Sequence, residues 1–275
     1  MGQARQGIKR VVVCTVVLTT VAQLTSIEFA RAQVADEPGL NTDGSAAPHH
    51  SVALDVPRVA YTDTAFGVGP GVLGAAGFGE VRGSAAQGSD PRLGGGIRLW
   101  VSPIDRLLLV LDAQRRDSNN QFAPAATAQV RIVGSEREGW ALGALARYKT
   151  EGFATLESEV EAGLLGSVNR NRLHVDLNLV VGGDFDGQEG DGELLVRGGY
   201  EVLPFFRVGA EGRGRYRVAG NTDLPGGRTW DVFAGPQLFA FSDHYFGALT
   251  AGPSTVAMVD RLGWSAIACA GGVMF

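Results

Sequence analysis

The chain has 275 residues, of which 45% are hydrophobic and 40 are glycine, about twice the usual glycine content, and its formal net charge is −5. A mildly acidic chain without a basic cluster is poorly suited to bind nucleic acid, so no nucleic-acid partner is expected. After residue 32 no apolar run is long enough for a membrane-spanning helix, which leaves a soluble core or a closed membrane barrel as architectures.

Residues 1–32 have the pattern of a secretory signal peptide. Arg5, Lys9 and Arg10 precede an uncharged run over residues 11–24, and Ala-Arg-Ala at 30–32 supplies a cleavage motif. A retained membrane anchor is the alternative, but the run is shorter than the roughly 20 apolar residues such a helix needs, and Thr and Gln interrupt it. We therefore predict that residues 1–32 are removed after export.

The remaining chain begins with a polar stretch. Residues 33–70 are rich in Pro, Gly, Asp and Asn, which predicts a flexible periplasmic lead-in. Four basic residues and one acidic residue leave with the signal peptide, so the remainder carries a net charge of about −8. Cys269 becomes the only cysteine, which excludes an intramolecular disulfide.

Residues 71–275 divide into segments of about ten to fourteen residues bounded by turn residues. They predict an all-β fold, a closed antiparallel up-and-down transmembrane β-barrel of about 12 strands, with 8 to 10 or 14 strands as alternatives. The expected strands cover 71–83, 92–102, 107–116, 125–134, 139–149, 152–166, 172–183, 192–202, 205–217, 228–240, 245–257 and 263–275.

Strict alternation of side-chain character is the main evidence for these strands. Over 205–217, apolar or small residues alternate with five charged residues, and 172–183 repeats the pattern with leucines and valines opposite His174 and Asp176. One face of each strand therefore suits lipid and the other suits a polar interior.

The connections between strands also alternate in length. Those after even-numbered strands are tight, and those after odd-numbered strands are mostly longer, as short periplasmic turns and long outer loops would be. Two connections, near 150–151 and near 259–262, are expected to be short where a long loop belongs.

The end of the chain carries a family-level resemblance. Phe275, Val273 and Ile267 share one parity of the last strand. Together with the export signal and the alternation, this resembles the terminal-strand insertion signal of Gram-negative outer-membrane β-barrel proteins. Gly271 departs from the usual pattern, where a bulkier residue is common. The resemblance implies an outer-membrane location, with outer-membrane lipid and the barrel-insertion machinery as partners.

An exported soluble β-sandwich is the alternative architecture, because it too alternates apolar and polar residues. The chain contains little Lys after residue 32, and its aromatic residues lie near the ends of the expected strands. Aromatic girdles at two membrane interfaces predict that placement, so the barrel is favoured. The aromatic residues in question are Trp100, Trp140, Tyr148, Tyr200, Tyr216, Trp230 and Tyr245.

The charged faces of the strands identify the candidate site, the lining of the barrel lumen. We expect a narrow pore for small solutes or ions, or a structural membrane protein with a salt-bridged, filled interior. The expected lumen-lining residues are Glu157, Glu159, Glu161, Arg172, His174, Asp176, Glu193, Arg197, Arg207, Glu211, Arg213 and Arg215.

Other functions have weaker support in the sequence. Asp184, Asp186, Glu189 and Asp191 form an acidic segment that could bind a hard cation, but it lacks the EF-hand spacing, so no metal or cofactor is expected. No Ser and His are arranged for nucleophilic catalysis, so an enzyme is not expected, and a lipid-modifying enzyme remains an alternative. Surface recognition through the loops at 184–191 and 219–227 is a third hypothesis.

Overall fold

The computed structural model describes eight stretches of the chain. They are residues 63–65, 69–84, 92–116, 121–150, 158–185, 190–219, 230–254 and 263–274. The chain divides into two units, Met1–Ala53 and Leu54–Phe275, and every described residue belongs to the second. The expected signal peptide and the lead-in as far as residue 62 lie outside the described residues.

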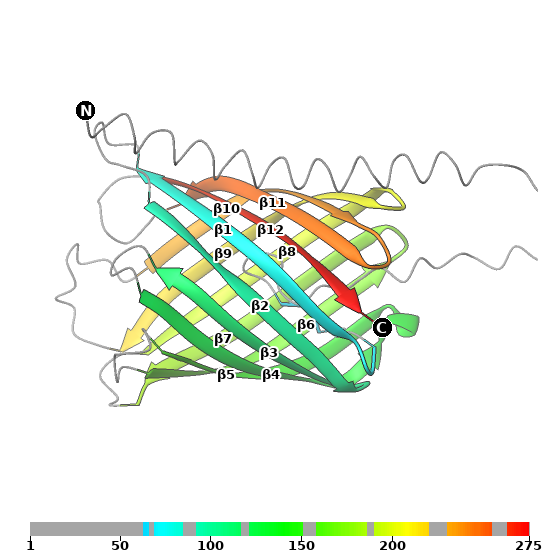
Figure 1. Ribbon diagram of the computed structural model, residues 1–275, viewed down its shortest axis with the longest axis horizontal. Coiled ribbons are helices and arrows are strands. Elements are labelled where there is room, and N and C mark those ends of the chain that lie inside the picture. The colour runs from blue at the N-terminus through cyan, green and yellow to red at the C-terminus, as the bar shows by residue number, and fades with distance from the viewer. Residues whose placement is uncertain are drawn as a thin grey trace, which may run out of the picture. The chain divides into compact units, whose positions relative to one another are not determined.

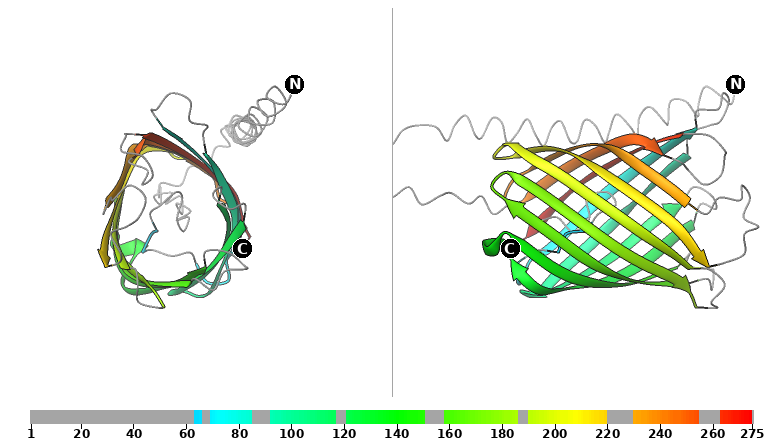
Figure 2. Two further views of the ribbon diagram at one scale, coloured as in Figure 1. Left: turned by 90° about the vertical axis from the view of Figure 1, so that its left-hand side faces the viewer. Right: turned by 180° about the vertical axis from the view of Figure 1, so that it is seen from behind.

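Twelve tilted strands form one closed barrel in which each strand pairs with its neighbours in sequence (Figures 1 and 2). The fold class expected from the alternation is confirmed. The strands are β1 (Leu73–Ser84), β2 (Arg92–Ile104), β3 (Leu107–Arg116), β4 (Gln121–Ser135), β5 (Trp140–Thr150), β6 (Ser158–Arg170), β7 (Leu173–Asp184), β8 (Gly190–Leu203), β9 (Phe206–Ala219), β10 (Trp230–Phe241), β11 (Tyr245–Ser254) and β12 (Gly263–Met274).

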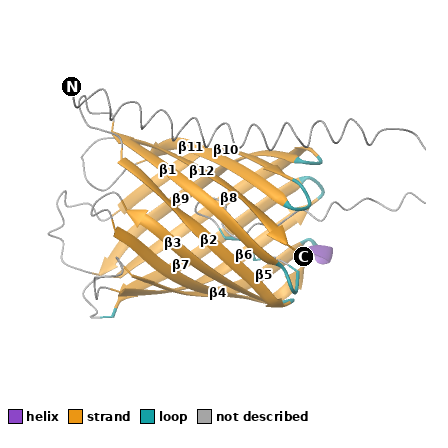
Figure 3. Ribbon diagram, in the orientation of Figure 1, coloured by secondary structure: helices purple, strands orange, loops and turns teal. Residues whose placement is uncertain are grey.

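Helical structure is almost absent from the described part of the chain. A single 3-10 turn, Glu136–Glu138, lies between β4 and β5 (Figure 3). No helix among the described residues is long and apolar enough to cross a membrane.

The first and last strands close the barrel. β1 pairs with β12 in antiparallel register from Leu73 opposite Met274 to Ser84 opposite Gly263, without a bulge. β1 pairs on its other side with β2. Every strand therefore has two neighbours, and the barrel has no free edge at which another chain could pair.

Side chains alternate between the outside and the inside of the barrel. Along β7, Leu177, Leu179 and Val181 are exposed, whereas Asp176 and Asn178 are buried. Large apolar side chains are exposed on the outer faces of all twelve strands. A continuous apolar outer surface is typical of a protein surrounded by lipid.

Aromatic side chains are concentrated at the two ends of the outer surface. Trp140, Tyr200 and Tyr245 lie at the end with the tight turns, and Tyr148 and Tyr216 lie toward the opposite end. Such girdles are expected at the two membrane interfaces. Trp100 corrects the sequence interpretation, because its side chain is 1% exposed and points into the barrel.

The connections follow the expected alternation. Tight turns follow the even-numbered strands, and mostly longer connections follow the odd-numbered strands. The two connections expected to be short, after β5 and after β11, fall on residues 151–157 and 255–262, which lie outside the described residues.

Glycine permits close strand contacts inside the barrel at a few positions. A Cβ atom on Gly252 of β11 would overlap the carbonyl oxygen of Ala234 and the Cα atom of Gly235 on β10. The two strands could keep their present separation only with glycine at this position.

Replacing Gly252 with alanine is therefore expected to lower the free energy of unfolding by about 1–3 kcal/mol, the usual cost of overpacking. Urea unfolding of the protein in lipid vesicles, followed by tryptophan fluorescence, measures this loss. Gly77→Ala on the outer face of β1 is the control, because a Cβ atom there would meet no atom within 4 Å. Equal stability of the two variants would contradict the packing argument.

Candidate functional site

The inner face of β5 to β9 carries alternating stripes of charge. Basic side chains on β5 face acidic side chains on β6, and basic side chains on β9 face acidic side chains on β8, toward the end with the longer connections. The paired groups stand directly opposite each other in the strand register or are offset diagonally by two residues. Each charge therefore lies beside an opposite one. The residues are Arg147, Lys149, Glu159, Glu161, Asp191, Glu193, Arg213 and Arg215.

Arg147 on β5 joins three different elements. Its Nε donates to Thr127 Oγ1 at 3.0 Å, its Nη1 to Glu161 Oε2 at 2.8 Å, and its Nη2 to Asp63 Oδ2 at 3.0 Å. All of these side chains are buried. Each guanidinium nitrogen therefore has a partner, and the pairing offsets the cost of burying the charge.

Lys149 extends this cluster toward the end with the longer connections. Its Nζ lies 2.5 Å from Glu161 Oε1 and 2.9 Å from Glu159 Oε2. Two cations, Arg147 and Lys149, thus stand among the carboxylates of β6 and Asp63.

Asp176 on β7 is the centre of a second buried cluster. Its Oδ1 accepts from Ser167 Oγ at 2.6 Å, and its Oδ2 accepts from Arg197 Nε at 2.8 Å and Nη2 at 2.6 Å. His174 Nε2 lies 3.0 Å from the same Oδ2. The carboxylate is 0% exposed, so these donors replace the water that it would otherwise bind.

The polar row continues around the barrel wall. Glu211 on β9 stands opposite Arg197 in the register. Gln237 Nε2 on β10 donates to Glu211 Oε2 at 3.2 Å and to Thr250 Oγ1 at 3.0 Å. Polar side chains therefore follow one another from β6 to β11.

Arg213 and Arg215 on β9 form the third group of pairs. Arg213 Nη2 donates to Glu193 Oε1 at 2.6 Å, and Arg215 bonds to Asp191 through Nε at 2.7 Å and also through Nη2. Arg215 is the most exposed of these cations, at 36% of its side chain. These pairs lie close to the end of the barrel with the longer connections.

Apolar side chains fill other parts of the interior. Phe246 lies against Trp100 and Phe239, and Arg207 lies 5.6 Å and 5.5 Å above the rings of Phe239 and Phe241. A separate, apolar cluster contains side chains from β5 to β8, from β10 and β12, and from residue 65. Its members are Ala65, Ala141, Leu145, Leu165, Val180, Leu195, Phe233 and Ile267.

A short stretch that precedes the barrel lies within it, and we call residues 63–65 the lumenal segment. Asp63, Thr64 and Ala65 are buried, at 5%, 1% and 4% exposure. Thr64 Oγ1 lies 3.2 Å from Ser167 Oγ, and the amide nitrogen of Ala65 donates to the same oxygen at 2.7 Å. These three residues fall within the expected lead-in of 33–70, and their contacts are with the inner wall of the barrel.

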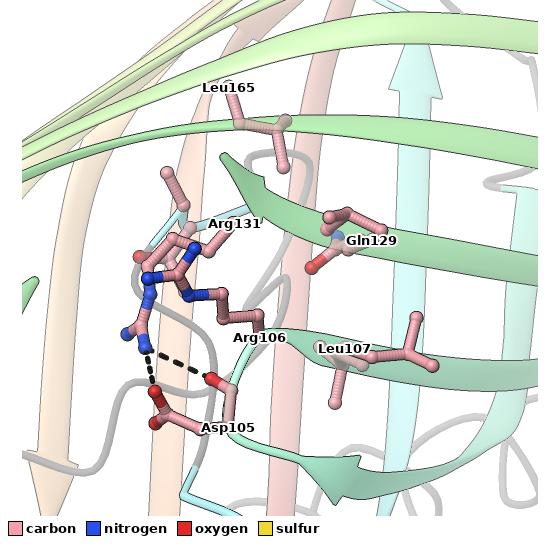
Figure 4. Close-up of a pocket in the computed structure, with 10 residues that line it drawn as sticks. Asp105, Arg106, Leu107, Gln129, Arg131 and Leu165 are labelled. Carbon is pink, nitrogen blue, oxygen red and sulfur yellow. Dashed lines mark hydrogen bonds and ion pairs between the residues drawn. The ribbon is translucent and has the colours of Figure 1, made fainter. Parts of the chain in front are cut away.

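Little empty space remains beside the lumenal segment. Thr64, Ala65, Gln129 and Leu165 are among the residues around a cavity of about 10 Å³ (Figure 4). Arg131 borders it and donates to Asp105 Oδ2 at 2.7 Å and to the Asp105 carbonyl at 3.0 Å. A cavity of that size has room for about one water molecule and is far too small for a small-molecule ligand.

The structure places most, but not all, of the expected lumen-lining residues on the inner face. Arg172 lies in the exposed turn between β6 and β7, where strand alternation has ended. Glu157 lies outside the described residues. The inward-facing residues are Glu159, Glu161, His174, Asp176, Glu193, Arg197, Arg207, Glu211, Arg213 and Arg215.

The expected insertion signal and cation segment are only partly described. Val273 and Ile267 point into the barrel and are buried, and Phe275 lies outside the described residues. Asp186 and Glu189 also lie outside them. Among the residues that the structure describes, no three His, Cys, Asp or Glu side chains are placed to hold a metal ion.

The buried Ser, His and Asp side chains do not form a catalytic triad. Ser167 and His174 both bond to Asp176, whereas a triad needs the base between the nucleophile and the acid. His174 also points into the barrel, away from the lipid that a lipid-modifying enzyme would act on. The cluster is better explained as a structural polar network.

Comparison with known proteins identifies the fold but no family. No protein-family model matches the chain, and no curated protein matches it. Among solved structures, the chain is similar to a porin named NanC, with a TM-score of 0.53 and 9% identity over 72% of this chain and 100% of that one. It is also similar to the KdgM porin, with a TM-score of 0.54 and 9% identity over 74% of this chain and 99% of that one.

These similarities bear on architecture alone, because the sequences share so few residues. The chain has the fold of outer-membrane β-barrel proteins, in agreement with the resemblance noted from its sequence. What the barrel does must be argued from its interior.

Proposed function

We propose that the protein is a narrow outer-membrane pore for ions or small polar solutes. The observation that supports this best is the inner wall of β5 to β9, where charges of both signs line the interior while the outer face is apolar. In this proposal the apolar face contacts outer-membrane lipid, and the insertion machinery recognises the last strand.

The balance of charge suggests how such a pore would select its solutes. Arg213 and Arg215 are paired with Glu193 and Asp191, so neither sign dominates that part of the wall. Pairs of this kind favour weak selectivity between cations and anions, since each carboxylate field is largely cancelled by its neighbour.

Replacing both Arg213 and Arg215 with glutamine is expected to make the pore prefer cations, because two positive charges would be removed while Asp191 and Glu193 keep their negative charges. Reversal potentials in planar bilayers under a salt gradient measure this, and we expect the cation-to-anion permeability ratio to rise at least roughly twofold. Arg137→Gln, in the exposed turn before β5, is the matched control. An unchanged ratio in the double variant would exclude this wall from the conduction path.

A structural membrane protein without conduction is the second candidate. The apolar cluster around Leu145, Leu165 and Phe233 and the docked lumenal segment favour it, because they occupy part of the interior. The absence of current steps from purified protein, in the wild type and in variants designed to empty the lumen, would favour this candidate over a pore. Recovery of the protein in soluble periplasmic extracts would exclude both candidates.

A further inference from the structure

The lumenal segment is bound by polar and apolar side chains on one wall of the barrel. Arg147 binds the carboxylate of Asp63, and Ser167 binds both Thr64 and the amide of Ala65. The methyl group of Ala65 joins the apolar cluster that contains Leu145 and Leu165. Polar and apolar contacts thus fix three successive residues to β5 and β6.

The direction of the segment follows from the strand register. Ala141 of β5 stands opposite Ser167, and Arg147 stands opposite Glu161, six residues further along β5. Ala65 is therefore held nearer the end with the tight turns, and Asp63 is held nearer the end with the longer connections. The segment runs along the lumen and does not merely border its mouth.

The wall does not need the segment for its charge balance. Without Asp63, the cations Arg147 and Lys149 still face the carboxylates of Glu159 and Glu161. With Asp63 docked, the cluster holds three carboxylates for two cations. Undocking therefore leaves a compensated wall, whereas removing Arg147 would not.

The chain remains attached to the barrel on the other side of the segment. Gly71 donates its amide to the Ser102 carbonyl at 2.7 Å, and the Ser102 amide donates to the Val72 carbonyl at 2.9 Å. These bonds extend the pairing of β1 and β2 and keep the segment close to its binding site, at a high effective concentration.

We propose that the lumenal segment is a removable occupant of the lumen whose docking on Arg147 and Ser167 narrows the pore. This inference rests on the proposed pore function for its effect on conduction, but not for the docking itself. Asp63 and Ser167 are positioning residues, because they hold the lumenal segment against the wall. The free cross-section of the lumen is smaller when the segment is docked and larger when it is undocked.

The first experiment tests docking by disulfide cross-linking, a readout that does not depend on conduction. Thr64 Oγ1 and Ser167 Oγ are 3.2 Å apart, so Thr64→Cys combined with Ser167→Cys would place two sulfur atoms near bonding distance. The double variant is made in a full-length chain with Cys14→Ala and Cys269→Ala. We expect mild oxidation in native membranes to form the bond, detected by peptide mapping.

The mismatched control for this cross-link is Thr64→Cys with Val168→Cys. Val168 follows Ser167 on β6 but is exposed on the outer face of the barrel, so the wall separates the two thiols. Failure of the matched pair to cross-link, or equal cross-linking of the control, would overturn the docking.

Conduction is tested next with Asp63→Asn, which weakens docking and leaves the pairs among β5 and β6 in place. We expect a severalfold increase in single-channel conductance or open time. Asp63→Asn in the double-cysteine chain should lose that increase when the disulfide forms and regain it on addition of reductant. Asp243→Asn, in the exposed turn between β10 and β11, is the control for loss of one carboxylate and should behave as the wild type.

The outcomes separate the two proposals. Equal currents from the oxidised and the reduced double-cysteine chain with Asp63→Asn would overturn the narrowing role of the segment. The proposed pore function would not be affected by that result. No current in any variant, with the disulfide formed, would overturn the pore function and the narrowing with it. Normal currents without cross-linking would overturn the docking of the lumenal segment alone.

Discussion

Replacing Arg147 with methionine is expected to lower the free energy of unfolding by about 3–5 kcal/mol, the range found when one partner of a buried ion pair is removed. The guanidinium bonds to Thr127, Glu161 and Asp63, and all four side chains are buried. Without it, Lys149 alone would face the remaining carboxylates. Methionine keeps most of the side-chain volume, so the loss reports on charge and hydrogen bonding more than on packing.

Urea unfolding in lipid vesicles measures this change, and heat-modifiable migration on gels gives an independent readout of barrel integrity. Arg137→Met is the control, because Arg137 is exposed in the 3-10 turn and exposed charges contribute about 1 kcal/mol or less. Combining Arg147→Met with Glu161→Gln should recover part of the loss, since only the carboxylates of Asp63 and Glu159 would then remain near Lys149. A single variant as stable as the wild type would show that the cluster is hydrated in the folded protein.

Replacing Asp176 with alanine is expected to have a comparable effect, about 3–5 kcal/mol, because three buried donors lose one acceptor. Arg197 would still face Glu211, so charge is not the main loss. Ser167, Arg197 and His174 would instead lose their shared acceptor. Buried donors left without an acceptor cost about 1–3 kcal/mol each.

Asp176→Asn distinguishes hydrogen bonding from charge at the same position. The amide oxygen can still accept from Arg197, and the amide nitrogen can donate to the Ser167 hydroxyl, so we expect about half the loss of the alanine variant. Asp105→Ala is the control, because Asp105 is 67% exposed in its pair with Arg131 and should lose little. Unfolding curves in vesicles again provide the measurement, and losses of equal size in the Asn and Ala variants would contradict the hydrogen-bond account.

The barrel was predictable from the sequence because a strand that separates lipid from a polar interior must alternate residue by residue. Segments with charge on one face, such as 205–217, were placed within one or two residues of β9. The described part of β6 begins at Ser158, so the first six residues of the expected strand, 152–157, lie outside the described residues.

The charged pairs were predictable in kind, since neighbours in a hairpin must face each other, but the filled interior was not. Ile267 lies on a strand whose two faces are both largely apolar or small, so no clear periodic signal shows which face points inward. The lumenal segment has no local signal either. Asp63 and Arg147 are 84 positions apart, and a polar stretch before a barrel gives no indication that it docks inside.

The closing pair of strands also constrains how the protein can fold. Leu73 of β1 pairs with Met274 of β12, so the ends of the barrel meet only when almost the whole chain is available. Loop closure over so many residues is entropically costly and slow. Every earlier intermediate exposes two unpaired edges, each a template for aggregation. The chain must therefore be kept from self-association until the barrel closes, and a truncation within β12 would leave those edges open permanently.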